Sequence, residues 1–112
     1  MNRVASLATL WFRIPTGSRS VHVTFVKKIL ADGTLCRKCH DVEQRLERDG
    51  YWSSIDAAVV ADERDPHSAG MVLAKKLNVQ YAPFFVVRQG DETRVYTIYL
   101  QFVREVLETR QR

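Results

Sequence analysis

The segment TLCRKCHD contains the residues of this chain best suited to chemistry. It holds the only two cysteines, Cys36 and Cys39, and His40 follows the second one directly. A C-x-x-C pair can serve as a redox-active dithiol, C-x-x-C-H can attach haem, and C-x-x-C with two further ligands can bind zinc. The secondary structure around the pair is therefore needed to distinguish a redox dithiol from a haem site and from a zinc site.

The residues that follow the first cysteine predict a helix over residues 37–48. Cys39, Val42 and Leu46 recur at the spacing of one helix face, and that face is apolar. Cys36 then stands at the start of the helix, next to backbone N–H groups that have no partner within the helix. The second cysteine is expected to lie one turn into the helix and to face the core.

This placement predicts different roles for the two sulfurs. The positive end of the helix dipole stabilises an anion by about 0.3–1 kcal/mol at an exposed site, so the pKa of Cys36 is expected to lie below that of a free thiol. The neighbouring side chains Arg37 and Lys38 are expected to tune the pair by adding positive charge. Burial has the opposite effect on Cys39. We therefore expect Cys36 to attack a disulfide and Cys39 to resolve the mixed disulfide.

The rest of the chain alternates strands and helices. Apolar and β-branched runs predict strands over residues 21–26, 55–61, 84–87 and 94–100. Helical spacing predicts two further helices, after Asp65-Pro66 and over residues 100–110. The order is β-α-β-α-β-β-α, which predicts an α/β fold with a mixed four-stranded sheet and helices on both faces.

Four sites are predicted to delimit the first two helices. The Thr34 hydroxyl is placed to cap the first helix, and Gly50 is placed to end it. Asp65-Pro66 has the residue types of an N-cap and a first helical position, and Asn78 can stop the helix that follows.

Composition and charge exclude several classes of function. The length of 112 residues suits one domain, and 46% apolar with 27% charged residues is a globular balance. The net charge of +4 is scattered, without a run of five or more Lys and Arg, so we expect no nucleic-acid partner. No apolar run approaches the roughly 18 residues of a membrane span. We expect a monomer that does not bind membranes.

A turn-rich segment, IPTGSRS, separates two parts of the chain. Residues 1–20 are expected to be a loosely ordered leader, and residues 21–110 the folded domain. The leader has a short apolar stretch, but Arg13 interrupts it and no small-x-small cleavage site follows. We therefore expect the protein to be cytoplasmic.

Three features together resemble the thioredoxin-like superfamily in its short, glutaredoxin-like form. They are CRKC at the start of a helix after a strand, Ala82-Pro83 in YAPFFVV before a later strand, and the final hairpin and helix. The resemblance covers roughly residues 21–107. It implies a thiol-disulfide oxidoreductase with no cofactor, in which Cys36 and Cys39 are catalytic. It also implies that Pro83 is cis and faces the cysteines, and that Ala82, Pro83 and Phe84 bind the substrate.

The chain departs from the pattern of that superfamily at several positions. Arg37-Lys38 replaces the usual sequence with Pro between the cysteines, and Leu35 stands where thioredoxins have Trp. The region RQGDET lacks the Gly-Gly-x-Thr-Asp turn with which glutaredoxins bind glutathione. Asp32 is the nearest counterpart of the buried acid of thioredoxins. The expected partners are a protein disulfide and a reductase or glutathione as electron source.

Three alternatives remain open at this stage. A redox-inactive module of the same fold would use the site for binding alone. Zinc would need ligands beyond the two cysteines, and His22 and His67 are more simply read as surface or packing residues. Haem would need a distant axial ligand such as Met71, whereas c-type haem proteins are mostly helical. We therefore expect no metal site.

Overall fold

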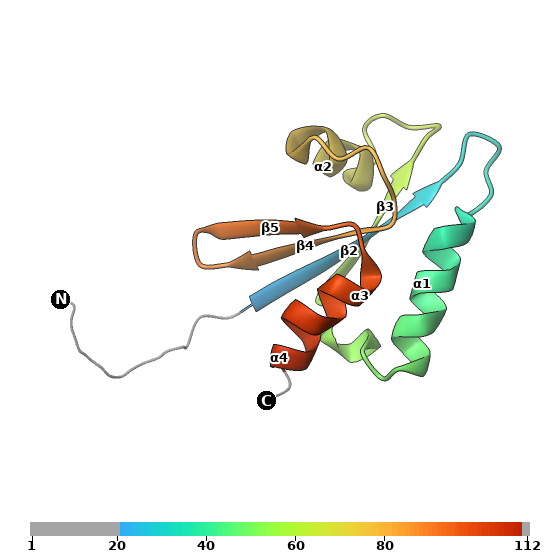
Figure 1. The fold of residues 1–112 in the computed structure, drawn as a ribbon. Helices are drawn as coiled ribbons and strands as arrows, with labels where there is room; N and C mark the ends of the chain where they lie inside the picture. The colour runs from blue at the N-terminus through green and yellow to red at the C-terminus, as the bar shows by residue number, and fades with distance from the viewer. Residues whose placement is uncertain (1–20, 111–112) are drawn as a thin grey trace.

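A computed structural model describes residues 21–110 and contains one mixed four-stranded sheet. The strands are β2 (Val21–Ile29), β3 (Ala57–Asp62), β4 (Phe84–Gln89) and β5 (Glu92–Tyr96), in the spatial order β3-β2-β4-β5 (Figure 1). Strands β2 and β3 are parallel, whereas β4 is antiparallel to both β2 and β5. The predicted leader, residues 1–20, lies outside the described residues.

The helices cover both faces of this sheet. Helix α1 (Arg37–Arg48) and the C-terminal helix pack on one face, and α2 (Ala69–Leu77) packs on the other (Figure 1). The C-terminal helix consists of α3 (Tyr99–Phe102), a π-helical turn η3 (Val103–Leu107) and α4 (Glu108–Arg110); a short 3₁₀ turn, η2 (Trp52–Ser54), follows α1. The predicted element order and fold class are confirmed. No helix within residues 21–110 is long and apolar enough to cross a membrane.

The larger core lies between the sheet and the pair formed by α1 and the C-terminal helix. Phe85 of β4 stacks with Phe25 of β2, at 5.2 Å between ring centroids, and with Phe102, at 3.9 Å. Leu46 of α1 and Leu107 complete this core and are fully buried. Side chains of this size each contribute about 1.5–3 kcal/mol when removed from water, so this core fixes α1 against β2.

The smaller core lies on the opposite face, under α2. Val26, Phe84 and Val86 alternate along β2 and β4 with the residues of the first core, because successive side chains of a strand point to opposite faces. Met71 and Leu77 of α2 pack on them and are half-buried. The interpretation of Met71 as a core residue is therefore confirmed.

The predicted start of α2 was wrong by several residues. Helix α2 begins at Ala69, with Ser68 as its N-cap residue, rather than after Asp65-Pro66. The Asp65 carboxylate accepts the N–H of His67 at 2.9 Å, and the Asp65 carbonyl accepts the N–H of Ser68 at 3.1 Å. These bonds close a separate turn before the helix, which an Asp side chain stabilises as readily as a helix start.

The other predicted ends have mixed outcomes. Asn78 ends α2 with a left-handed φ of 58°, and Gly50 follows the end of α1 with a φ of 79°, as predicted. Thr34 does not cap α1, because its hydroxyl donates to the Asp32 carboxylate at 2.6 Å. The last strand, predicted over residues 94–100, ends at Tyr96, since Tyr99 already belongs to α3.

Candidate functional site

Cys36 is the N-cap residue of α1, so the predicted placement of this sulfur at a helix start is confirmed. Its N–H donates to the carbonyl of Lys28 at 2.9 Å, and its own carbonyl accepts the N–H of His40 at 3.0 Å. An isolated antiparallel bridge joins Leu35 to Ile29. The backbone on both sides of Cys36 is therefore fixed, by the end of β2 before it and by the helix after it.

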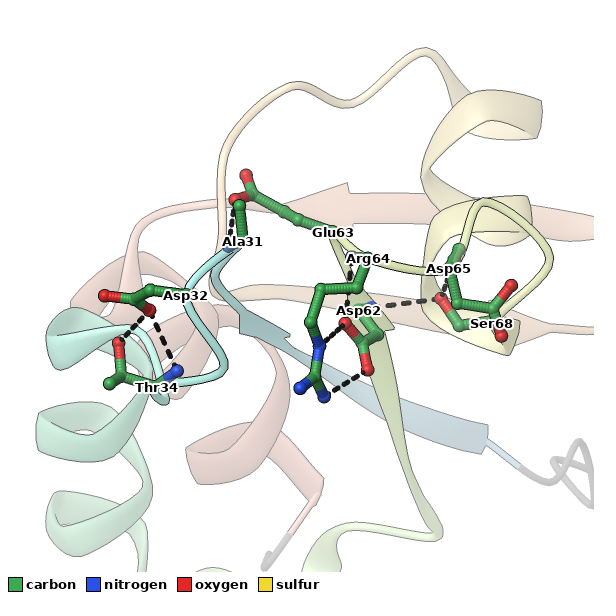
Figure 2. Close-up of polar contacts among 8 residues, drawn as sticks. All are labelled: Ala31, Asp32, Thr34, Asp62, Glu63, Arg64, Asp65 and Ser68. Carbon is green, nitrogen blue, oxygen red and sulfur yellow. Dashed lines mark hydrogen bonds and ion pairs between the residues drawn. The ribbon is translucent and has the colours of Figure 1, made fainter.

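The loop between β2 and α1 is also tied to the end of β3. The Glu63 carboxylate accepts the N–H of Ala31 at 3.0 Å (Figure 2). Within the loop, the Asp32 carboxylate accepts both the N–H and the hydroxyl of Thr34. On the β3 side, Arg64 donates two side-chain hydrogen bonds of 2.9 Å to Asp62 (Figure 2). These contacts hold the loop that delivers Cys36 to the helix.

The Cys36 sulfur is half-exposed and electrostatically favoured as an anion. Partial burial alone would raise the pKa of Cys36, but four other interactions outweigh it. The N–H of Cys39, the Cys39 thiol and the N–H of Lys38 donate to the sulfur, and the ammonium group of Lys28 adds a positive charge. Together they hold the pKa of Cys36 below its usual value, as expected for a thiolate at a helix start.

Cys39 differs from Cys36 in both burial and acidity. Its side chain is 0% exposed. Burial raises the pKa of the Cys39 thiol to about 12; the N–H of Lys28 opposes this effect, while the hydrogen bond and charge of Cys36 add to it. Both cysteines are free thiols in the structure. The pair therefore combines one accessible, acidic sulfur with one buried, protonated sulfur.

A single strand residue, Lys28, contacts both halves of this pair. Its carbonyl accepts the N–H of Cys36 at 2.9 Å, and its N–H donates to the sulfur of Cys39 at 3.3 Å. Its ammonium group forms an ion pair with Glu63 at 3.4 Å, and its charge lowers the pKa of both thiols. Lys28 was not predicted from the sequence as a site residue. Its position near the end of the strand that leads to the cysteines is the feature from which it could have been predicted.

Replacing Lys28 by Met is expected to make Cys36 less reactive. The backbone bonds to both cysteines remain, whereas the positive charge is lost and the pKa of Cys36 rises. At neutral pH the alkylation rate of Cys36 is then expected to fall by about two- to fivefold, the range for charge interactions at partly exposed sites. Stopped-flow alkylation of the reduced protein measures this rate. Lys27→Met is the matched control, because the ammonium group of Lys27 pairs with Glu43 at 3.1 Å. Equal effects of the two substitutions would contradict the role of Lys28.

The two pKa directions also predict how alkylation depends on pH. Only the thiolate reacts, so its rate rises with pH and levels off above the pKa. In the folded protein, Cys36 is expected to reach half of its maximal rate at a pH below that of a free thiol. Cys39 is expected to react much more slowly than Cys36 at each pH, because burial is the largest cause of its raised pKa and remains after Cys36 has reacted. Peptide mass analysis after iodoacetamide pulses measures each site. In guanidinium chloride the two cysteines should react alike; the same result in the folded protein would refute the asymmetry.

The Ala82–Pro83 peptide bond is cis, as the resemblance implied. Pro83 lines a hollow of about 240 Å³ together with Lys38, the residue that precedes Cys39. Ala82 and Phe84 line a second hollow of about 280 Å³ that also contains Lys28. Residues on both sides of the cis bond thus line hollows, and each hollow is also lined by a lysine that adjoins the cysteine pair. The strand order, the antiparallel β4, the cysteine pair at a helix start and this cis bond together give the chain a thioredoxin-like fold.

Comparison with known proteins adds one structural likeness. Among solved structures, the chain is similar to thioredoxin f from spinach chloroplast, in its long form, with a TM-score of 0.44 and 17% sequence identity. The alignment covers 80% of this chain and 68% of that chain. No protein-family model matches the chain, and no curated protein matches it.

The remaining predicted site residues fall in different places. Arg37 and Lys38 are exposed, and the effect of their charges on the thiols stays a prediction. Phe84 is 1% exposed and packs in the smaller core. Asp32 is exposed in the loop, and no charged side chain is buried within residues 21–110, so a buried acid beside Cys39 is missing from this part of the chain. Nor do three or more His, Cys, Asp or Glu side chains of these residues gather into a possible metal site.

Proposed function

We propose that the protein is a thiol-disulfide oxidoreductase whose reactive groups are Cys36 and Cys39. One observation carries this proposal: an accessible sulfur with a lowered pKa stands at the N-terminus of α1, and a fully buried sulfur with a raised pKa lies one turn into the same helix. Such a pair separates the attacking thiol from the resolving thiol.

The proposed reaction transfers two electrons. The Cys36 thiolate attacks one sulfur of a substrate disulfide, a bond forms between them, and the substrate S–S bond breaks. The second substrate sulfur leaves as a thiolate. The Cys39 thiol gives its proton to the thiolate that has left, and its sulfur attacks the sulfur of Cys36. The first substrate sulfur is released as a thiolate, which takes up a proton from water. The substrate is reduced to a dithiol, and Cys36 and Cys39 are oxidised to a disulfide.

The structure supplies a reason for the order of these steps. In the reduced protein, the hydrogen bond and the negative charge of Cys36 both raise the pKa of Cys39. When Cys36 enters a mixed disulfide, it loses that charge and can no longer act as a thiolate partner. The N–H and the charge of Lys28 continue to favour the Cys39 anion. The resolving thiol therefore becomes more acidic only after the first step has occurred.

The proposed substrate is a protein disulfide that binds beside the cis bond, along the backbone of Ala82, Pro83 and Phe84, since the Phe84 side chain is buried in the smaller core. Ala82 and Phe84 border one hollow and Pro83 the other, so a chain lying across the bond would reach both. A reductase or glutathione would return the electrons to the pair. In the cytoplasm, where thiols are kept reduced, the pair would act as a reductant.

A redox titration with mass analysis tests the proposal. The protein is equilibrated in dithiothreitol or glutathione buffers of stepped potential, and free thiols are then trapped by alkylation. We expect two species only, with both cysteines alkylated or neither, and a tenfold change in their ratio for about 30 mV. A pair that stays reduced across the series, or cysteines that change independently, would leave the fold with a binding role and no redox chemistry.

A further inference from the structure

The hollow beside Pro83 is lined by buried or half-buried apolar side chains and by exposed charged ones. Its apolar lining comes from Val42 of α1, Phe85 of β4 and Tyr99 of α3. Two cationic side chains, Lys38 and Arg45, line it from α1, two turns apart on the same helix face. A ligand in this hollow would therefore contact both apolar surface and positive charge.

The two cations in the hollow have no carboxylate partner within residues 21–110. Lys27, Lys28 and Arg64 all form ion pairs there, whereas Lys38 and Arg45 do not. The guanidinium group of Arg45 instead lies 4.8 Å from the ring centroid of Tyr99. A guanidinium group that lies over a ring can still donate hydrogen bonds from the N–H groups at its edge. Arg45 can therefore contact Tyr99 and bind a ligand at the same time.

The charge of the hollow favours a carboxylate ligand. Asp41 is the one acidic residue that lines it, so the three ionised side chains leave an excess of positive charge. Lys38 also stands between Cys36 and Cys39 in the sequence, so one lining residue of the hollow directly precedes the buried cysteine. A carboxylate on the segment that carries the substrate cysteine would face these cations.

Exposed apolar residues continue the surface beyond the hollow. Thr97 and Tyr99 line it, and Ile98 between them is 59% exposed, with Leu100 at 55%. Carboxylates next to a disulfide occur both in acidic protein segments and in glutathione disulfide. The adjoining apolar surface favours a protein segment, because a tripeptide would leave most of it uncovered.

We propose that the hollow lined by Lys38, Arg45 and Tyr99 selects protein disulfides whose cysteine is flanked by acidic residues. This inference rests on the proposed function, since it names the substrate class of the same cysteine pair. The Arg45 guanidinium and the Lys38 ammonium group would bind the carboxylate, and the apolar lining would contact the neighbouring substrate side chains.

Paired synthetic peptides test this preference. Two peptides carry the same disulfide and differ only in flanking residues, two Glu in one and two Lys in the other; bis(2-hydroxyethyl) disulfide serves as an uncharged substrate. We expect the acidic peptide to be reduced about two- to fivefold faster at low ionic strength, as for partly exposed ion pairs. At about 1 M salt, where the Debye length is about 3 Å, the ratio is expected to approach one.

Variants locate the source of the preference. Arg45→Glu is expected to bring the ratio of acidic to basic peptide to one or below, and because the readout is a ratio, a general change in reactivity cancels. Arg104→Glu makes the same change of charge at an exposed position on the C-terminal helix and should leave the ratio as in the wild type. An equal loss in both variants would show a general charge effect and overturn the inference.

The outcomes separate this inference from the proposed function. If the wild-type protein reduces none of the three substrates, the oxidoreductase itself is refuted. If it reduces the uncharged disulfide and treats both peptides alike, only the acidic preference is refuted. Glutathione disulfide is tested as a further substrate. If Arg45→Glu slows the reduction of glutathione disulfide and of neither peptide, the hollow binds a small molecule, and the proposal of a protein substrate is refuted.

Discussion

Replacing Cys36 by Ser is expected to abolish disulfide reduction, while replacing Cys39 by Ser is expected to stop the reaction after its first step. The half-exposed sulfur of Cys36 has a lowered pKa and is the only accessible nucleophile of the pair. The serine hydroxyl is much less acidic than the Cys36 thiol and is not a nucleophile at neutral pH. Without Cys36, the buried Cys39, with a pKa raised to about 12, cannot replace it at neutral pH.

The two variants give distinct covalent products. Cys39→Ser retains the attacking thiolate, so it should accumulate a mixed disulfide that non-reducing gels and mass analysis detect, while turnover falls to the uncatalysed level. Cys36→Ser should form no such adduct. The double variant is the control for any reaction outside the pair. Wild-type activity in either single variant, or an adduct on Cys39 in place of Cys36, would refute the assigned roles.

The helix that carries the pair could be predicted from the sequence because its signals are local. Helix α1 spans the predicted residues 37–48, since the spacing of Cys39, Val42 and Leu46 and the left-handed position at Gly50 agree on one element. The burial of Cys39 follows from the same periodicity. In this segment the apolar spacing, the glycine after the helix and the packing on the core all indicate the same helix. A sequence predicts structure well where such local and tertiary preferences agree.

The parts that were missed depend on contacts between distant segments. Lys28 acts on both cysteines only because β2 ends beneath the start of α1, and nothing within the string CRKC indicates this. Glu63 comes to Ala31 because β2 and β3 pair in parallel and end at the same edge. The turn at Asp65 imitates a helix start in sequence, and only the backbone bonds distinguish the two. Such features are set by the sheet and not by local propensity.

Replacing Gly70 by Ala is expected to destabilise the protein severely. Gly70 is buried in the first turn of α2, where the helix meets β3. A Cβ at this position would lie 2.3 Å from the backbone nitrogen of Ala61 and 2.4 Å from the carbonyl carbon of Val60. Backbone atoms in a paired strand cannot rotate away as a side chain can, so α2 would have to move off the sheet. We expect a loss of about 3 kcal/mol or more, the upper range for overpacked sites, measured by urea unfolding.

Gly50→Ala separates steric conflict from backbone strain. Gly50 has a φ of 79°, and a Cβ there would meet no atom within 4 Å. Alanine at Gly50 is therefore expected to lose only about 1–2 kcal/mol, the cost of a left-handed conformation for an L-residue. At Gly70 the helix propensity of Ala would favour the variant by about 1 kcal/mol, so a large loss there can come only from the contact with β3. If the Gly70 variant unfolds at the same urea concentration as the wild type, the close packing of α2 on Ala61 is wrong. The smaller core under α2, which supports Phe84 beside the cis bond, would then need a different arrangement.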